Sequence, residues 1–321
     1  MYYEMFILGL ISSLFIYILL IPILKGRNIT QTVRSEGPTS HYSKNGTPIF
    51  GGVIFVFCTF VLFIFYSKLY HYTNKEIILL LFPLVFFALI GFLDDGLIVW
   101  LGKNNGLKAK NKLIFQIIGG LGFSFILKIL NHDTSIRIFD KVIELGEFYY
   151  VLVTLIIVSS TNAFNLTDGI DGLSGGSFII SMVSITFLSY LSSNYVITAY
   201  SFILIGTVLG YLCFNYKKAS IFMGDSGSLS LGAVISALFI ILKMEVLILF
   251  AGIIYIIETL SVIIQVIYFK LTKGKRIFKM TPIHHHFELV GLTEMKIDYL
   301  FWLIQVVGVL IAIYLGIKYY I

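Results

Sequence analysis

Long apolar runs separated by short polar segments set the pattern of this 321-residue chain. An α-helix needs about 20 apolar residues to cross the hydrocarbon core of a bilayer. Ten runs approach that length without the strict alternation of a membrane β-barrel strand, so each predicts a membrane-spanning helix. The predicted spans are 3–24, 49–67, 76–93, 113–130, 148–166, 176–192, 195–214, 228–242, 246–268 and 299–317.

Between the fourth and fifth spans the period changes. Residues 135–138 and 141–144 alternate polar and apolar side chains, which is typical of strands and predicts a small β-hairpin. In the ninth span, Glu258 and Gln265 interrupt an apolar run, so we expect both to face protein or a cavity rather than lipid. The pattern predicts an all-α integral membrane protein with a single polytopic domain, 1–321.

Composition agrees with a membrane protein. Residues AVILMFWYC make up 58% of the chain and charged residues only 12%, against about a quarter in soluble proteins, and the mean hydropathy is +0.94. The net charge of +6 could suggest nucleic-acid binding. Because basic residues flanking apolar spans usually set membrane orientation, we expect no nucleic-acid partner.

The distribution of positive charge predicts the orientation. Sixteen of the 23 Lys and Arg residues fall in loops on one side, namely 25–48, 94–112, 215–227 and 269–298. The richer side is cytoplasmic by the positive-inside rule. With an even number of spans, both termini and the hairpin are then extracytoplasmic.

Three acidic clusters lie on the predicted cytoplasmic side. Asp94 and Asp95 end the third span, at the unfavourable pole of the helix dipole, where a base, a phosphate-side carboxylate or a metal ligand competes with a solvated helix end. Asp168 and Asp171 lie in a glycine-rich turn with few nearby cations, and this favours function over capping alone. Asp225 opens the eighth span as a cap or as a ligand for a hard cation such as Mg²⁺.

A fourth cluster is the triplet His284-His285-His286. Three consecutive histidines point in different directions and do not suit one zinc ion, but they can donate to phosphate oxygens. The lysines before them are typical of contact with anionic lipid headgroups. Lys44 lies in a loop rich in Gly and Pro that is either a phosphate cradle or a turn. Together the clusters predict phosphoryl-type transfer at the cytoplasmic membrane face, which depends on positioning and charge neutralisation.

Six motifs carry a family resemblance along nearly the whole chain. They are SEGPTSHYSKNGTPIFGG (35–52), GFLDD (91–95), NAFNLTDGIDGL (162–173), FMGDSGSLSLG (222–232), ETLSVIIQV (258–266) and KRIFKMTPIHHHFELVG (275–291). In these motifs the chain resembles the phospho-N-acetylmuramoyl-pentapeptide-transferases, a branch of the polyprenyl-phosphate sugar-1-phosphate transferase superfamily. The alternative is a related polyprenyl-phosphate GlcNAc-1-phosphate transferase, against which the histidine triplet argues.

The resemblance implies a Mg²⁺-dependent enzyme in the bacterial plasma membrane, with its active-site cleft facing the cytoplasm and a possible homodimer. Its substrates would be UDP-MurNAc-pentapeptide and the membrane lipid undecaprenyl phosphate, and its products lipid I and UMP. Direct attack by the lipid phosphate and a two-step route through an aspartyl intermediate both fit, and we favour direct attack because Mg²⁺ can activate the leaving UMP.

The resemblance also implies residue roles. Asp225 is the expected magnesium ligand, and Asp94 and Asp95 are expected to serve the lipid phosphate, one of them as a base. The expected catalytic residues are Asp94, Asp95, Asp225 and His284. The expected substrate-binding residues are Lys44, Lys112, Asn165, Asp168, Asp171, Phe222, Gln265, His284, His285 and His286.

Overall fold

The computed structural model describes residues 1–27, 29–30, 44, 46–101 and 106–321, so positions 35–43 and 45 of the first motif lie outside the described residues. Within these ranges, ten helices are long and apolar enough to cross a membrane, which confirms the predicted number. They are α1 (Tyr2–Gly26), α2 (Gly51–Leu69), α3 (Asn74–Leu101), α4 (Ala109–Ile129), α5 (Phe148–Thr167), α6 (Leu173–Leu191), α7 (Tyr195–Asn215), α8 (Gly224–Ile241), α10 (Ile253–Leu271) and α12 (Glu294–Tyr319).

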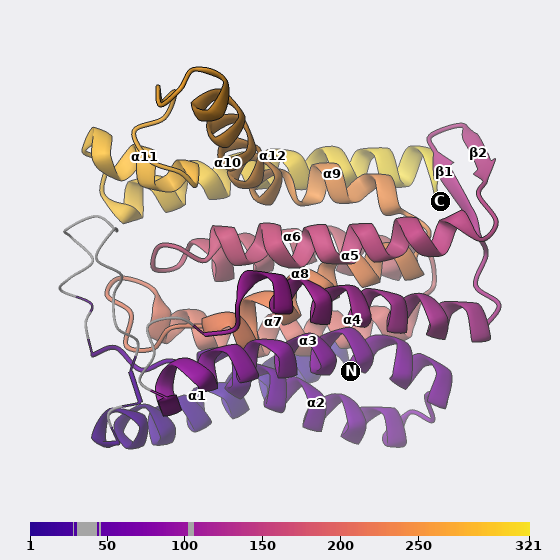
Figure 1. The fold of residues 1–321 in the computed structure, drawn as a ribbon. Helices are drawn as coiled ribbons and strands as arrows, with labels where there is room; N and C mark the ends of the chain where they lie inside the picture. The colour runs from indigo at the N-terminus through magenta and orange to yellow at the C-terminus, as the bar shows by residue number, and fades with distance from the viewer. Residues whose placement is uncertain (28, 31–43, 45, 102–105) are drawn as a thin grey trace.

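The predicted ninth span is broken, and a single helix over 246–268 is therefore wrong. A 3₁₀ turn, η2 (Glu245–Leu247), leads into the short α9 (Ile248–Ala251), and α10 starts after Gly252, whose φ of −117° is not helical. Glycine is a poor helix former because it loses the most backbone entropy on ordering. After this break, α10 leans away from the bundle (Figure 1).

A short helix in the last long loop was not predicted. α11 (Ile283–Val290) begins directly after Pro282 and ends at Gly291, whose φ is +105°. Proline before a helix and a left-handed glycine after it are ordinary start and stop signals. The signals were present in the sequence, but eight residues are too few for a clear apolar period.

The predicted hairpin is confirmed at both strands. β1 (Ser135–Ile138) pairs antiparallel with β2 (Lys141–Glu144). The hairpin lies at the end of the bundle where the chain finishes (Figure 1). There the Tyr320 hydroxyl donates to the Arg137 carbonyl at 2.8 Å, and Arg137 donates to the Tyr319 carbonyl at 3.2 Å. The last residues of the chain therefore hold the hairpin in place.

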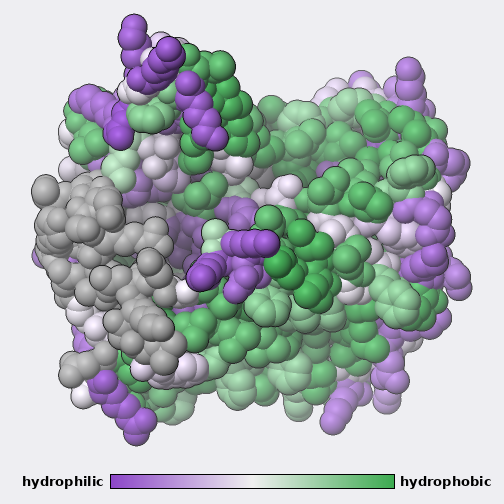
Figure 2. Space-filling model, viewed as in Figure 1, coloured by the Kyte–Doolittle hydropathy of each residue, from purple (hydrophilic) through white to green (hydrophobic). Residues whose placement is uncertain are grey.

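Helices far apart in the sequence pack side by side. α1 packs on α7, α3 on α8, and α12 on α6. α8 is the central helix, because 83% of its most apolar stretch is buried, against 22% for α1. In Figure 2, apolar side chains cover much of the visible face, hydrophilic ones stand at its two ends, and a further hydrophilic group lies left of centre. This banding is what a bilayer-spanning bundle requires.

The contact between α3 and α8 depends on Gly91. A Cβ atom placed on Gly91 would overlap the backbone of Asp225 and Ser226. The missing side chain therefore lets α3 approach the first turn of α8 at backbone distance. Asp94 and Asp95 follow Gly91 by one helical turn, so this close approach also brings the carboxylates of both helices together.

We predict that Gly91→Ala destabilises the protein, by about 1–3 kcal/mol as is typical of overpacking. The measurement is the melting temperature of the purified protein in detergent. Gly26→Ala is the matched control, since no atom lies within 4 Å of a Cβ placed there. Equal melting temperatures for Gly91→Ala and the wild type would contradict this account of the α3–α8 contact.

Candidate active site

Asp95 fixes the start of α8. Its side chain is only 2% exposed, and its two carboxylate oxygens accept the backbone N–H groups of Asp225 and Ser226, each at 3.0 Å. The first N–H groups of a helix have no partner within the helix, and they carry the positive end of its dipole. A carboxylate from α3 therefore caps α8 and places the Asp225 side chain beside Asp94.

Asp94 and Asp225 share one ammonium group. Lys112, at the start of α4, lies 3.3 Å from Asp94 Oδ2 and also contacts Asp225 Oδ2. The Asn165 amide, near the end of α5, donates to Asp225 Oδ1 at 2.7 Å and to the Ser228 hydroxyl at 2.8 Å. Four helices, α3, α4, α5 and α8, thus bring four of the predicted site residues into contact.

The donors of this cluster suit a hard divalent cation. Among the described residues, no group of three or more His, Cys, Asp or Glu side chains could hold a metal, which argues against an all-protein metal cage. Mg²⁺ usually takes one or two carboxylates and leaves its other positions to water and substrate phosphates. Asp94 and Asp225 provide two carboxylates that already hold a cation, the Lys112 ammonium, between them. The cluster therefore fits magnesium in the presence of a phosphate ligand.

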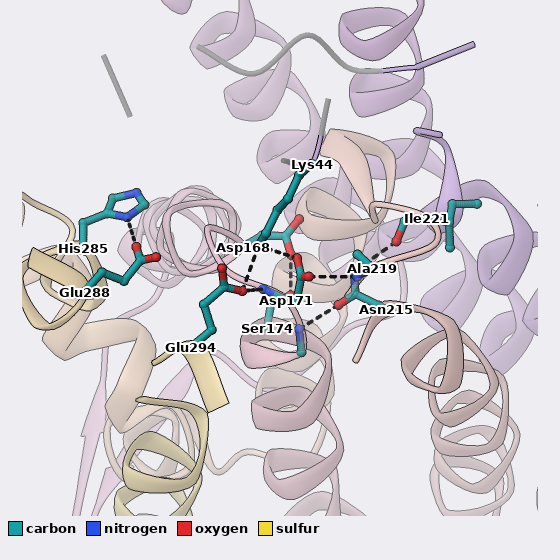
Figure 3. A network of polar contacts seen from close by, with 11 residues as sticks. Lys44, Asp168, Asp171, Ser174, Asn215, Ala219, Ile221, His285, Glu288 and Glu294 are labelled. Atoms are coloured by element: carbon teal, nitrogen blue, oxygen red, sulfur yellow. Dashed lines mark hydrogen bonds and ion pairs between the residues drawn. The ribbon is translucent and has the colours of Figure 1, made fainter. Parts of the chain in front are cut away.

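Asp168 lies in the loop between α5 and α6 (Figure 3) and accepts a hydrogen bond from the Ser174 hydroxyl at 2.5 Å. Burial raises the pKa of Asp168 to about 6, although the Ser174 hydrogen bond opposes the shift. The nearby carboxylates of Asp225 and Asp171 raise this pKa further. A proton is therefore available at this position in weakly acidic solution.

Lys44 ties the first loop to two other parts of the chain. Its ammonium lies 2.8 Å from Asp171 Oδ1 and 2.8 Å from Glu294 Oε2, so that the lysine reaches between the two acids in Figure 3. Burial disfavours the charge, but the two carboxylates outweigh it and raise the pKa of Lys44. Asp171 also accepts the Ala219 N–H at 2.8 Å, which connects this group to the loop before α8.

Phe222 lies in that loop, directly ahead of α8. Its N–H donates to the Pro48 carbonyl at 2.8 Å, and its carbonyl accepts the Gly51 N–H at 2.8 Å. These two backbone bonds join the end of the first loop and the start of α2 to the approach of α8. The aromatic side chain is partly exposed and is held at a fixed position.

Two of the predicted residues on α10 and α11, Gln265 and His286, bind backbone groups of the loop between these helices. Gln265 is 8% exposed, and its carbonyl oxygen accepts the N–H groups of Ile277 and Phe278 at 3.1 and 3.0 Å. His286 Nδ1 accepts the Lys279 N–H at 3.2 Å. Both side chains therefore hold the backbone of the loop that leads into α11.

The other two histidines of α11 each lie beside a glutamate. His285 Nδ1 lies 2.7 Å from Glu288 Oε2, as Figure 3 shows. His284 is 0% exposed and turns inward, where Nδ1 lies 3.0 Å from Glu258 Oε1. Glu258 is itself fully buried, which confirms the prediction that this intramembrane acid faces protein. His284 is thus the member of the triplet that points into the bundle.

An apolar cavity of about 410 Å³ lies within the bundle. It lies between α5, α8 and α10, and its walls include Leu155, Phe164, Ile235, Tyr255 and Leu260. Phe164 directly precedes Asn165, the residue that holds Asp225. The lining also includes Ile136 of β1 and Glu245 of η2, so the cavity extends along the bundle from the hairpin end as far as Phe164.

Comparisons with known proteins agree with this geometry. Residues 77–243 match the family described as glycosyl transferase family 4. The phospho-N-acetylmuramoyl-pentapeptide-transferase of Bacillus subtilis (strain 168) is 42% identical over 315 residues, covering 96% of this chain and 97% of its own length. The chain belongs to the phospho-N-acetylmuramoyl-pentapeptide-transferase family. It is a multi-pass membrane transferase.

Two further relatives with the same name support the assignment to the phospho-N-acetylmuramoyl-pentapeptide-transferases. The one from Oceanobacillus iheyensis is 42% identical over 299 residues, covering 92% of this chain and 91% of its own. The one from Halalkalibacterium halodurans is 39% identical over 318 residues, covering 97% and 98%. The similarity extends over almost the full length of each chain, so the whole bundle of this transferase is shared.

Several supporting residues of this transferase were not predicted from the sequence. Asn215 accepts the Gly172 N–H at 2.8 Å and donates to the Ile221 carbonyl at 3.0 Å, and Glu294 binds Lys44. Asn215 ends an apolar span and Glu294 begins one, positions where polar residues are ordinary. Among these supporting residues, Glu258 was the one that the sequence could indicate, because a lone acid within an apolar run is expected to face protein.

The raised pKa of Asp168 predicts a pH dependence of stability. Below about pH 6 the folded protein keeps this carboxyl protonated, whereas the group ionises near 3.8 in the unfolded chain. Folding therefore takes up a proton between these values, and the resulting stability is lost as the pH rises through 6. For a fully buried group, a shift of this size would lower the free energy of unfolding by about 3 kcal/mol over this pH range. Because Asp168 is partly exposed, we expect a smaller decrease.

We therefore expect Asp168→Asn to reduce the fall in melting temperature between pH 4.5 and pH 7. Asp140→Asn, an exposed aspartate of the hairpin turn, is the matched control and should behave like the wild type. The same pH dependence in Asp168→Asn and the wild type would mean that another group is responsible.

Proposed function

We propose that this protein transfers phospho-N-acetylmuramoyl-pentapeptide from UDP-MurNAc-pentapeptide to undecaprenyl phosphate. The products are lipid I and UMP, and the reaction is the first membrane step of peptidoglycan synthesis. The observation that carries the proposal is the similarity to enzymes of that name over nearly the whole chain. The convergence of Asp94, Lys112, Asn165 and Asp225 supports it, since phosphoryl-type transfer needs groups of this kind held in place.

We further propose the orientation of this bundle. The excess of Lys and Arg in four loops supports a cytoplasmic position for the site and an extracytoplasmic position for both termini and the hairpin. A cytoplasmic site has direct access to nucleotide-activated precursors. The interleaved packing of α1 with α7 and of α12 with α6 supports one transferase domain over 1–321, and the family resemblance supports a homodimer.

The proposed magnesium site consists of Asp225, with Asp94 beside it. When bound, Mg²⁺ neutralises the diphosphate and makes UMP a better leaving group. Asn165 orients the Asp225 carboxylate through its amide. Lys112 balances the two negative charges, and its ammonium is free to move to a phosphate oxygen when substrate arrives, because a lysine side chain is a flexible point charge.

Asp94 and Asp95 receive different roles in this proposal. The Asp95 carboxylate accepts two N–H groups of the first turn of α8, so it positions Asp225. The Asp94 side chain contacts Lys112 and is 7% exposed, against 2% for Asp95, and Asp94 is therefore proposed as the residue that keeps the lipid phosphate deprotonated. The lipid phosphate then attacks the substrate diphosphate directly, and no covalent step on the protein is needed.

The remaining residues are proposed to hold the nucleotide sugar. Asp168 and Asp171, in the loop between α5 and α6, and Phe222, in the loop before α8, are proposed to line the nucleotide pocket. Asn165 is proposed to help hold the uridine. Gln265 and His286 shape the loop that covers this region, and Lys44 closes its far side. His284 and His285 are proposed to contact the phosphate or the sugar, His284 through Nε2, which lies against Gly169.

The apolar cavity is the proposed place for the first isoprene units of the lipid. Its walls are mostly aliphatic and aromatic, with Leu155, Phe164 and Leu260 among them. Burial of apolar surface is favourable in proportion to its area, and a chain held there presents its phosphate toward Asn165 and Asp94. One lipid and one soluble substrate thus meet at the carboxylates.

The proposal predicts that purified protein releases UMP when it is given Mg²⁺, undecaprenyl phosphate and UDP-MurNAc-pentapeptide. EDTA should stop the release, and added Mg²⁺ should restore it. UMP can be measured by chromatography and lipid I by mass spectrometry. No product from this pair, together with UMP release from UDP-GlcNAc, would move the protein to the related GlcNAc-1-phosphate transferases.

Asp225→Asn should lower turnover by about 100-fold or more, since loss of one preorganised electrostatic contact typically costs that much. In the wild type, Mg²⁺ with UMP should raise the melting temperature because ligands stabilise the state that they bind, and this rise should disappear in the variant. Asp140→Asn serves as the control. Near-normal activity and an unchanged Mg²⁺ effect in Asp225→Asn would exclude Asp225 from the metal site.

A further inference from the structure

The buried pair formed by Glu258 and His284 lies behind the carboxylate cluster. Glu258 belongs to α10 and His284 to the first turn of α11, and each side chain is 0% exposed. Glu258 Oε1 and His284 Nδ1 are 3.0 Å apart. An ionisable side chain in the middle of an apolar helix is costly, so its retention at this position calls for a reason.

The pair fixes the hydrogen positions on the imidazole. A carboxylate can only accept a hydrogen bond, so Nδ1 of His284 carries the hydrogen and donates it to Glu258. The opposite nitrogen, Nε2, is then the free one. Carboxylates that hold a functional histidine in one tautomer through Nδ1 are a general device in enzymes and metal sites.

The free nitrogen points at the loop between α5 and α6. A Cβ atom placed on Gly169 would overlap Nε2 of His284, so the glycine leaves the room that the imidazole occupies. Nε2 is buried and has no hydrogen-bond partner among the residues that the structure describes. His284 also interacts electrostatically with Asp168. The imidazole therefore lies directly against the loop that carries Asp168, which the proposed function assigns to the nucleotide sugar.

We propose that Glu258 is a positioning residue for the transfer reaction. It holds the His284 ring with Nε2 toward the loop that carries Gly169. When Nε2 takes up a proton from solvent, the negative charge of Glu258 compensates the imidazolium, and Nε2–H can then donate a hydrogen bond to a phosphate oxygen of the substrate. This inference rests on the proposed function and adds to it the residue that orients the histidine.

A purely structural role explains the pair less well. Packing alone would be served by an apolar residue at 258, because replacing a buried charged pair by apolar residues is often neutral or stabilising. The second carboxylate oxygen, Oε2, also lacks a hydrogen-bond partner within the described part of the chain. Glu258 thus carries a desolvation cost for which its contact with His284 is the one compensation that the described hydrogen bonds record.

The first test is Glu258→Gln, measured by steady-state UMP release. We expect kcat to fall about 10- to 100-fold, as is typical when the group behind a functional histidine is lost. The KM for UDP-MurNAc-pentapeptide should stay within about two-fold and the melting temperature should stay near the wild-type value. Glu258→Asp keeps the charge and should retain more activity than Glu258→Gln.

Glu147→Gln is the matched control, because it removes an exposed glutamate paired with Lys128 at the hairpin end and should match the wild type. Wild-type kcat in Glu258→Gln would overturn the inference. A fall in kcat together with a clearly lower melting temperature would also overturn the inference, because loss of folded protein would then explain the lower activity. If the wild type itself releases no UMP, the proposed function fails instead.

The second test does not depend on activity. ¹⁵N NMR of histidine-labelled protein reports which ring nitrogen carries the hydrogen, and His284→Gln identifies the signal of His284 by its loss. We expect the Nδ1–H tautomer in the wild type and a shift toward the Nε2–H tautomer in Glu258→Met. An unchanged tautomer in Glu258→Met would show that Glu258 does not orient the ring.

Discussion

The hydrogen bonds from the first turn of α8 to the Asp95 carboxylate hold the centre of this molecule in place. α8 is the most enclosed of the ten spans, and its first N–H groups lie where neither lipid nor the helix itself can satisfy them. Asp95 accepts two of them from α3. Because Asp225 is part of that same turn, the hydrogen bonds that stabilise the fold also determine where the proposed metal-binding carboxylate lies.

Other polar side chains around the site also stabilise the backbone and position the site at the same time. Gln265 and His286 accept backbone N–H groups of the loop before α11. Asn215 accepts the Gly172 N–H and donates to the Ile221 carbonyl, which joins the turn after Asp171 to the loop before α8. A polar residue that serves the backbone in this way is as necessary as one that contacts substrate, since an unpaired buried backbone group costs as much as a lost hydrogen bond. Much of the motif pattern therefore encodes loop conformation.

The sequence was sufficient for features that depend on local periodicity. The ten spans follow from apolar length, the hairpin from alternation at Ser135–Ile138, and the burial of Glu258 from its isolation in an apolar run. The break at Gly252 could not be predicted, because most glycines in membrane helices leave the helix intact. α11 was too short to show a period.

The site was predictable as a set of residues and less so as an arrangement. Asp94, Lys112, Asn165 and Asp225 were all selected from the sequence, but their contacts depend on how α3, α4, α5 and α8 pack. Likewise, the ion pairs of Lys44 with Asp171 and Glu294 join residues separated by more than a hundred positions. No local pattern records such pairings, because only the assembled bundle creates them.

Because the helix is interrupted at Gly252, α10 is a separate segment, and it carries several side chains that contact the site. Tyr255 and Leu260 form a wall of the apolar cavity, Glu258 holds the His284 ring, and Gln265 holds the loop before α11. Any swing of α10 about this glycine moves all three together. A change in the angle at this glycine would alter the width of the proposed lipid cavity and the position of the imidazole at the same time. In the proposed function, entry of a prenyl chain and assembly of the phosphate site would then be coupled.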